Sequence, residues 1–252
     1  MTSLVEKKAI FTSFDLSLLD RSKVPKHVAV IMDGNRRWAK ENNLPPVMGH
    51  WQGAEVLIDI VKAASELGIE TVTAYSFSTE NWNRSPEEVE ALMQIMESYL
   101  REKKDLMVEE GICLGMIGDI SKIPDPVQKA FFEAQKATSS GKKINLVLAI
   151  NYGARDELRR AFGKILALHE KTPFPLEKLT EQLIAEHLDT KDWGDPDLMI
   201  RTSGERRISN FLLWQLSYTE LSVLQKHWPD FTPHDLLNSI VEFQKRDRRL
   251  GG

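Results

Sequence analysis

Short apolar runs alternate along the chain with longer stretches in which apolar residues recur every three or four positions. The short runs are rich in Val, Ile, Leu and Ala, which is typical of strands buried on both faces of a parallel sheet. They predict strands over His27–Asp33, Thr71–Ser78, Ile112–Gly118, Ile144–Asn151 and Leu198–Thr202, with a further short strand near Glu220–Leu224.

The longer stretches predict helices. One carries apolar residues at helical spacing over 54–67 and has a stop signal at Gly68. Another begins with Ser85 as N-cap, Pro86 at the first position and Glu88 at the third, which together predict a capping box. Further helices are predicted over Pro126–Thr138, Ala154–Glu170, Leu179–Leu188 and Pro233–Arg248.

This alternation predicts the fold class: an α/β protein with a single open, mainly parallel β-sheet of about six strands, flanked by helices. We expect one domain over residues 25–252, because no repeat, low-complexity segment or linker interrupts it. Residues 1–24 precede this domain as an N-terminal segment that can be flexible.

Composition narrows the function classes. The 33 Lys and Arg against 37 Asp and Glu give a formal charge of −4, which disfavours a nucleic-acid binder because phosphate binding needs excess cations. The one cysteine, Cys113, excludes an intramolecular disulfide framework and CxxC motifs, so we expect a reducing, cytoplasmic location. The apolar runs fall short of the roughly 18 residues that a spanning helix needs.

The familiar phosphate-loop, dinucleotide, HExxH and GxSxG motifs are absent from the sequence. Polar clusters instead follow three predicted strands, over 33–38, 78–84 and 201–209. The carboxyl edge of a parallel sheet is where ligands bind. Each cluster combines arginine with Gly, Ser or Asn, so together they indicate a site for a multiply charged anion such as diphosphate.

Asp33 places one carboxylate among these cations, and a hard ion such as Mg²⁺ would account for it. Trp38 and Trp82 lie beside the arginines and suggest apolar walls, hence a ligand with a charged head and an apolar body. Each feature also has a structural alternative: Asp33-Gly34 is a common turn, paired arginines are often solvated, and tryptophans are often core. Only their coincidence at one sheet edge favours a site.

Five segments, in the same order along the chain, resemble motifs of the cis-prenyltransferases, the family of the undecaprenyl diphosphate synthases. They are HVAVIMDGNRRWAK (27–40), AYSFSTENWNRSPEEV (74–89), NYGAR (151–155), RTSGERRISNFLLWQLSYTEL (201–221) and WPDF (228–231). The resemblance covers about residues 25–252. It implies repeated condensation of isopentenyl diphosphate with an allylic diphosphate, typically farnesyl diphosphate, into a long polyprenyl diphosphate such as the undecaprenyl carrier lipid of glycan synthesis.

The resemblance also implies Mg²⁺ as cofactor, a homodimer, and peripheral membrane contact for product release. Growth of the product needs an apolar tunnel between sheet and helices. We expect its walls at the residues Leu57, Ile58 and Val61 of one helix, at the helix that starts at Ser85, and at the strand residues Leu146 and Leu148.

Roles transfer by motif position. Asp33 matches the aspartate that binds Mg²⁺ and assists departure of the allylic diphosphate. Asn81 matches the proposed proton acceptor, although a neutral amide is a poor base, and we expect it to orient the substrate or relay to a diphosphate oxygen. Glu220 matches a second metal-linked carboxylate, near the site shared in the homodimer.

The remaining matched positions bind substrate. The allylic diphosphate is expected at Gly34, Asn35, Arg36 and Arg37, with Trp38 and His50 nearby. The junction of the two substrates is expected at Ser78, Thr79 and Glu80, with Trp82 and Arg84 adjacent. Isopentenyl diphosphate is expected at Arg201, Arg207, Ile208 and Ser209.

Four positions depart from the commonest family pattern. Arg36 stands where glycine is frequent, and Ala154 replaces the second glycine of NYGGR. Pro46 stands where an arginine often contacts the allylic diphosphate, and Arg206 replaces a histidine sometimes linked to metal. Three alternatives stay open. They are a relative with another product length, a non-catalytic partner subunit, and a Mg²⁺-dependent phosphohydrolase that uses Asp33. The last is disfavoured because no second acidic residue follows Asp33 in its segment.

Overall fold

A six-stranded, fully parallel sheet forms the centre of the computed structural model, which describes residues 9–247. Its strands run in the order β3-β4-β2-β1-β5-β6. They are β1 His27–Ile31, β2 Thr71–Ser78, β3 Ile112–Ile117, β4 Ile144–Tyr152, β5 Leu198–Arg201 and β6 Glu220–Val223. The predicted fold class and all six predicted strands are therefore confirmed.

The α-helices are α1 Ser13–Ser17, α2 Asn35–Glu41, α3 Pro46–Leu67, α4 Pro86–Glu109, α5 Asp125–Thr138, α6 Ala154–Lys171, α7 Glu181–Ala185 and α8 Pro233–Gln244. Helix α2 forms where the sequence predicted a loop, and α3 begins before the first residue of its apolar stripe. Helix α7 is shorter than predicted. Within residues 9–247 no helix combines the length and apolar character needed to cross a bilayer.

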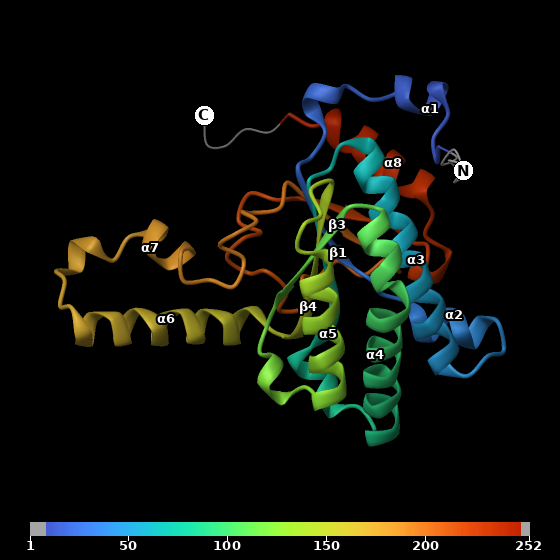
Figure 1. The fold of residues 1–252 in the computed structure, drawn as a ribbon. Coiled ribbons are helices and arrows are strands. Elements are labelled where there is room, and N and C mark those ends of the chain that lie inside the picture. Colours follow the sequence, from blue (N-terminus) through green and yellow to red (C-terminus); the bar gives the residue numbers. More distant parts are fainter. Residues whose placement is uncertain (1–8, 248–252) are drawn as a thin grey trace, which may run out of the picture.

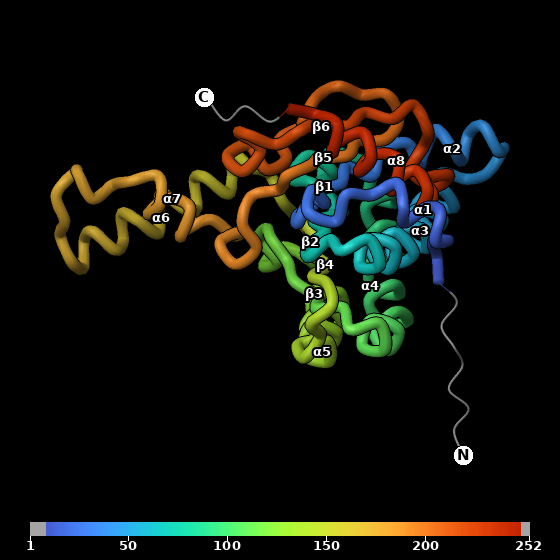
Figure 2. Tube along the Cα trace, turned by 90° about the horizontal axis from the view of Figure 1, so that it is seen from above, coloured from blue at the N-terminus to red at the C-terminus, as the bar shows by residue number. Residues whose placement is uncertain are grey.

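The sheet has two unequal faces. Val28 and Val30 of β1 point into a large apolar cluster that includes residues of α3, α4, α5 and α8, whereas Ala29 and Ile31 point into a smaller cluster on the other face. Figure 1 shows α3, α4 and α5 together on the large-cluster face, while α6 leaves the body as an arm with α7 folded back along it. The view from above gives the same arrangement (Figure 2).

The predicted capping box of α4 forms only in part. Ser85 accepts a hydrogen bond from the backbone N–H of Glu88 at 3.3 Å, as an N-cap does. The carboxylate of Glu88 instead accepts a hydrogen bond from Arg84 at 2.8 Å. The charge of Arg84 thus draws Glu88 toward the carboxyl edge of the sheet.

Part of the predicted N-terminal segment packs against the body of the protein. Phe11 is buried in the large cluster, and the backbone N–H groups of Ile10 and Phe11 donate to the carboxylate of Glu66 on α3 at 3.0 and 3.1 Å. Residues 9–24 thus have contacts with the domain, and the flexibility of the segment 1–24 stays a prediction. Residues 1–8 lie outside the described part of the chain.

Two helical glycines predict opposite effects on stability. A Cβ at Gly49 of α3 would lie 2.0 Å from the carbonyl oxygen of Asn35, so alanine there must push α2 and α3 apart. A Cβ at Gly163 of α6 would have no atom within 4 Å. We expect Gly49→Ala to lower the free energy of unfolding by about 1–3 kcal/mol. Gly163→Ala should raise it by about 0.5–1 kcal/mol, because alanine favours helix.

Denaturant unfolding of both variants measures the difference. Gly163→Ala is the matched control, since it makes the same chemical change in a helix without a close neighbour. A Gly49→Ala variant as stable as Gly163→Ala would contradict the close approach of α2 and α3.

Candidate active site

Three polar segments meet at the carboxyl edge of the sheet, as the sequence predicted. Strand β1 lies between β2 and β5, so the residues that follow these three strands are neighbours. Ile31 is in register with Arg201, which brings the segment after β1 beside the segment after β5. The segment after β2 joins them through the 3-10 helix Thr79–Asn83.

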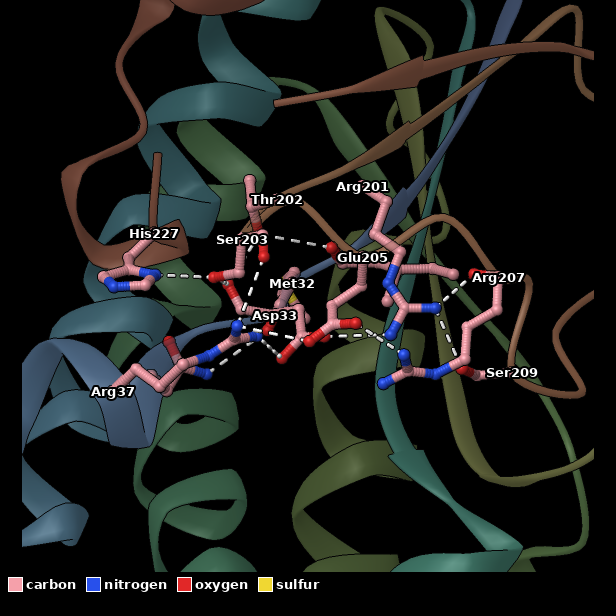
Figure 3. A network of polar contacts seen from close by, with 12 residues as sticks. Met32, Asp33, Arg37, Arg201, Thr202, Ser203, Glu205, Arg207, Ser209 and His227 are labelled. Atoms are coloured by element: carbon pink, nitrogen blue, oxygen red, sulfur yellow. Dashed lines mark hydrogen bonds and ion pairs between the residues drawn. The ribbon is translucent and has the colours of Figure 1, made fainter. Parts of the chain in front are cut away.

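Asp33 and Arg201 form the ion pair at the centre of this edge (Figure 3). Nη2 of Arg201 lies 2.9 Å from Oδ2 of Asp33, and the Arg201 side chain is only 4% exposed. Nη1 of Arg201 donates to Oγ of Ser209 at 2.8 Å and to the carbonyl oxygen of Arg207. One buried guanidinium therefore joins the segment after β1 to the loop after β5.

Two more arginines and a second carboxylate extend this network (Figure 3). Arg37 lies 3.2 Å from Asp33 through Nη2 and 3.2 Å from Glu205 through Nη1. Glu205 also pairs with Arg207 at 2.5 Å. Burial raises the pKa of Asp33, but the hydrogen bond and charge of Arg201 and the charge of Arg37 outweigh burial and hold it below its usual value. Asp33 is thus a carboxylate at neutral pH.

Two polar hollows adjoin Asp33. The α2 hollow, of about 610 Å³, is lined by Asp33, Gly34, Asn35, Arg36, Arg37, Lys40, Pro46, His50 and Arg84, among others. The β5 hollow, of about 600 Å³, is lined by Asp33, Ser78, Glu80, Asn81, Arg84, Arg201, Arg207, Ser209 and Asn210, among others. Two adjoining arginine-lined hollows thus share Asp33, and the residues assigned from the sequence to the two diphosphates are divided between them.

A third, apolar hollow of about 90 Å³ opens from the same place, between the sheet and helices α3 and α4. Leu57 and Leu148 line it, as predicted, together with Leu92 and Met96. The other predicted wall residues, Ile58, Val61 and Leu146, lie in the surrounding core. Met32, Asn35 and His50 line all three hollows.

Two polar atoms at this junction have no hydrogen-bond partner, although Nε2 of His50 lies 3.8 Å from Oε1 of Glu88. Oδ1 of Asn35 and Nε2 of His50 are buried without a hydrogen bond. Burial, followed by the charge of Arg84, lowers the pKa of His50 to about 4, so its ring is neutral at pH 7. Buried polar atoms without partners are rare in folded proteins, and here they are available to polar groups of a ligand.

Asn81 is a donor in this geometry. Its Oδ1 accepts the backbone N–H of Ser78 at 3.0 Å, which leaves the amide N–H groups for the β5 hollow. The neighbouring Glu80 accepts a hydrogen bond from Asn210 at 2.8 Å, and although burial raises its pKa, this bond and its other hydrogen bonds hold it below the usual value. A base role for Asn81 therefore has no support in its contacts.

Several predicted substrate-binding residues point elsewhere. The indole N–H of Trp38 donates to Asp230 at 2.7 Å, and that of Trp82 donates to Asn151 at 2.8 Å. Ile208 packs against the smaller cluster on the opposite face of the sheet. The side-chain oxygen of Thr79 lies against Gly153. Neither tryptophan lines any of the three hollows, so the predicted tryptophan walls have no support here, and the apolar surface comes from the α3–α4 hollow.

Glu220 and Asp33 lie at opposite ends of the sheet. Glu220 is the first residue of β6 and is in register with Leu198, at the amino end of β5. About five residues of strand, roughly 16 Å, separate that level from Asp33. Glu220 instead pairs with Arg246 at 2.7 Å. Within one chain these two carboxylates do not lie together, and the predicted role of Glu220 near a site shared in a homodimer stays a prediction.

Within residues 9–247 no cluster of three or more His, Cys, Asp or Glu side chains could hold a metal ion. Asp33 remains the carboxylate that fits one, because Mg²⁺ often takes one or two carboxylates together with phosphate oxygens of the substrate. The donor set therefore fits a metal that arrives with a diphosphate and does not fit a permanent metal cage.

Sequence reasoning missed several residues of the site. Lys40 and Met32 line the α2 hollow, Tyr75 and Asn210 line the β5 hollow, and Glu205 pairs with both neighbouring arginines. Lys40 lies one helical turn after Arg36, a signal available only once α2 is known to be a helix. The others depend on which side of a strand or loop faces the site.

Together, the fold and the site define an α/β protein with two arginine-lined hollows beside an apolar one. Comparison with known proteins agrees. The family described as "Putative undecaprenyl diphosphate synthase" matches residues 31–251. The "Isoprenyl transferase" of Clostridium tetani is 44% identical over 234 residues, which are 93% of this chain and 92% of that protein.

Two solved structures are also similar. Lavandulyl diphosphate synthase from Lavandula x intermedia, in complex with dimethylallyl diphosphate, has a TM-score of 0.89 at 37% identity and covers 92% of this chain and 100% of that one. A "probable undecaprenyl diphosphate synthase" from Campylobacter jejuni has a TM-score of 0.76 at 32% identity, covering 90% and 99%. The chain therefore belongs to the undecaprenyl diphosphate synthase family of prenyltransferases, the enzymes of cis-prenyl chain elongation.

The low pKa of His50 predicts a pH-dependent stability. Unfolding returns the pKa from about 4 to about 6.5, so the unfolded chain binds more protons between these values. The free energy of unfolding should therefore fall as the pH falls through this window, by about 1.4 kcal/mol per pH unit. In His50→Gln this contribution is lost, because glutamine does not titrate.

Denaturant unfolding of both proteins between pH 7 and pH 4.5 measures the effect. As the pH falls, the free energy of unfolding of the wild type should fall more steeply than that of His50→Gln. Parallel curves would contradict a buried, neutral His50.

Proposed function

We propose that this protein condenses isopentenyl diphosphate repeatedly with an allylic diphosphate, farnesyl diphosphate being the expected primer. The observation that carries the proposal is the junction of three hollows: two basic ones that share Asp33 and an apolar one that opens between them. Two diphosphate heads and one apolar chain need this combination of spaces. The α2 hollow takes the allylic diphosphate and the β5 hollow takes isopentenyl diphosphate.

On the allylic side, the C–O bond to the diphosphate breaks and negative charge grows on the leaving oxygens. Arg36, Arg37 and Lys40 line the hollow in which this charge develops. Fixed cations stabilise it without reorganisation. When Mg²⁺ is bound with the diphosphate, it neutralises further charge there, and Asp33 is the residue that would hold it.

On the isopentenyl side, Arg201, Arg207 and Ser209 hold the second diphosphate. Arg201 cannot turn away, because it is buried and paired. The double bond of isopentenyl diphosphate is thereby kept beside the allylic cation, and this positioning is itself catalytic. The new carbon–carbon bond forms there, and a proton then leaves. Asn81 serves as a donor that orients a diphosphate oxygen, and this oxygen is our proposed proton acceptor.

The growing chain enters the apolar hollow between α3 and α4. Its volume of about 90 Å³ is smaller than the 150 Å³ apolar cavity that holds one benzene, so the two helices must part as the chain lengthens. We propose a long-chain product, undecaprenyl diphosphate being the expected length from the family match and the bacterial relatives. Each buried methylene adds about 0.8 kcal/mol to retention, so release should be helped by peripheral contact with a membrane.

The alternatives are less well supported. A non-catalytic subunit does not need a complete pair of basic hollows around Asp33. One observation favours the phosphohydrolase alternative: the carboxylate of Glu205 lies near that of Asp33, since both pair with Arg37. Both carboxylates are paired with Arg37, however, which favours binding of a diphosphate over assembly of a hydrolytic metal pair.

Turnover of labelled isopentenyl diphosphate tests the proposal. Purified protein with farnesyl diphosphate, Mg²⁺ and mild detergent should give a ladder of products ending near the undecaprenyl length. Asp33→Ala should reduce incorporation at least about a hundredfold, because it removes the charge that organises both basic hollows. Phe132→Ala, on the exposed side of α5, is the control and should leave the ladder unchanged.

The end point separates the alternatives. A shorter or longer ladder keeps the chemistry and changes the product. Phosphate release without chain growth supports the hydrolase. No incorporation with any allylic primer supports the partner subunit.

We also propose that the protein is a homodimer. Helix α6 extends from the body in both views (Figures 1 and 2) and exposes Phe162 and Leu166, 44% and 64% accessible. Leu176 and Tyr218 are 78% and 72% exposed. A second copy would cover such apolar side chains. Only a second copy could also bring the Glu220 carboxylate toward a site like that of Asp33.

Leu166→Glu should therefore convert the dimer to a monomer, because it places a charge within the proposed interface. Analytical ultracentrifugation measures the mass. Phe132→Glu, at a similarly exposed apolar position on α5, should leave the dimer intact. A monomeric wild type, or a Leu166→Glu dimer as stable as the wild type, would contradict this interface.

A further inference from the structure

The backbone at the start of α2 is held unusually firmly. The carbonyl oxygen of Asp33 accepts three hydrogen bonds: from Oγ1 of Thr202 at 2.6 Å, from Oγ of Ser203 at 3.0 Å and from the backbone N–H of Trp228 at 3.0 Å. This carbonyl belongs to the peptide that joins Asp33 to Gly34. Its orientation decides in which direction the Asp33 side chain and helix α2 leave the sheet.

His227 lies beside Ser203 (Figure 3). Its Nδ1 is 2.6 Å from Oγ of Ser203. Gly34 completes the contact, since a Cβ there would lie 2.0 Å from Oγ of Ser203 and 2.7 Å from Nδ1 of His227. Gly34 also has a φ of +107°, a conformation that glycine adopts without strain. Ser203 is thus clamped between His227 and the turn that starts α2.

The same histidine reaches the other end of α2. Its Nε2 lies 3.1 Å from Oε1 of Glu41, the last residue of the helix. Between these two ends, Asp230 accepts the indole N–H of Trp38. The segment from His227 to Asp230 therefore lies along the whole of α2 and contacts its beginning, its middle and its end.

We propose that His227 is a positioning residue that fixes α2 through Ser203 and Glu41, so that Asp33 and Arg37 face the bound allylic diphosphate. The proposal rests on the proposed function, because it assigns that diphosphate to the α2 hollow. The Ser203–His227 pair does not act on substrate directly. Ser203 is 7% exposed and covered by Gly34, so its oxygen is directed to the backbone of Asp33.

Loss of His227 should change the kinetic constants for the two substrates to different extents. Arg201 and Arg207, which face isopentenyl diphosphate, are carried by β5 and its loop and not by α2. We therefore expect His227→Leu to raise KM for the allylic diphosphate and lower kcat, with a clearly smaller rise in KM for isopentenyl diphosphate. The ratio kcat/KM for the allylic substrate should fall about tenfold to a hundredfold, as for a misplacement of about 1 Å.

Three further variants make the test specific. His227→Asn keeps an N–H group near the position of Nδ1 and should recover most of the loss. Ser203→Gly removes the oxygen at a φ of +70° that suits glycine, and His227→Leu should add less to this variant than to the wild type. His234→Leu changes a largely exposed histidine at the start of α8 and should have no effect.

A folded His227→Leu variant with wild-type constants, or an equal rise of both KM values, would overturn the proposal. Should His227→Leu not fold, Glu41→Ala at the exposed end of the same contact is expected to give a smaller, equally selective rise in KM for the allylic substrate, and an unchanged KM there would overturn it.

Binding separates this inference from the proposed function. Calorimetry with inorganic diphosphate and Mg²⁺ should show weaker binding to His227→Leu than to His234→Leu, even if the wild type incorporates no isopentenyl diphosphate. Equal affinities, or no binding to the wild type, would overturn the positioning role. If the wild type shows no turnover but His227→Leu still binds diphosphate more weakly than His234→Leu, only the proposed function is overturned.

Discussion

The buried guanidinium of Arg201 is the element on which the site depends. It carries a charge into a nearly inaccessible position at the end of β5, which is costly unless every contact is satisfied. Asp33, Ser209 and the carbonyl of Arg207 satisfy most of it, and each belongs to a segment that would otherwise be a free loop. The requirement to pair one buried cation therefore fixes the relative positions of the segments after β1 and β5.

The arginines of the site are paired with carboxylates of the protein itself. The carboxylates of Asp33 and Glu205 pair with Arg37 and Arg207. A bound diphosphate would compete with these carboxylates for the same guanidinium groups, and a metal held by Asp33 would relieve the repulsion that follows. The arginines therefore always have an anionic partner, which is either a carboxylate of the protein or a diphosphate.

The unequal faces of the sheet explain why an apolar hollow lies beside so polar a cluster. Side chains of Val28 and Val30 face α3 and the other helices of the large cluster, whereas those of Ala29 and Ile31 face the smaller cluster. Since α3 and α4 both begin at the carboxyl edge, the space between them opens directly at Met32 and His50. A ligand head held at the edge can thus extend its apolar part along the helices.

Features that depend on residues close together in the sequence could be predicted, whereas features that depend on distant residues could not. Strand positions, the parallel sheet and the meeting of three arginine-bearing segments were readable, because alternation and strand ends are local patterns and parallel topology brings those ends together. Asp33, Arg37 and Arg201 were found this way.

Side-chain direction was not readable, because it depends on contacts distant in sequence. Trp38 turns to Asp230 and Trp82 to Asn151, partners 192 and 69 residues away, so neither forms the expected wall. Glu220 begins its strand, as the sequence predicted, and the register of β6 against β5 sets it level with Leu198, away from Asp33. The residues and their approximate place were thus set by the sequence, whereas the tertiary structure decided which of them face the ligand, because a side chain turns toward whichever partner the packed fold brings near.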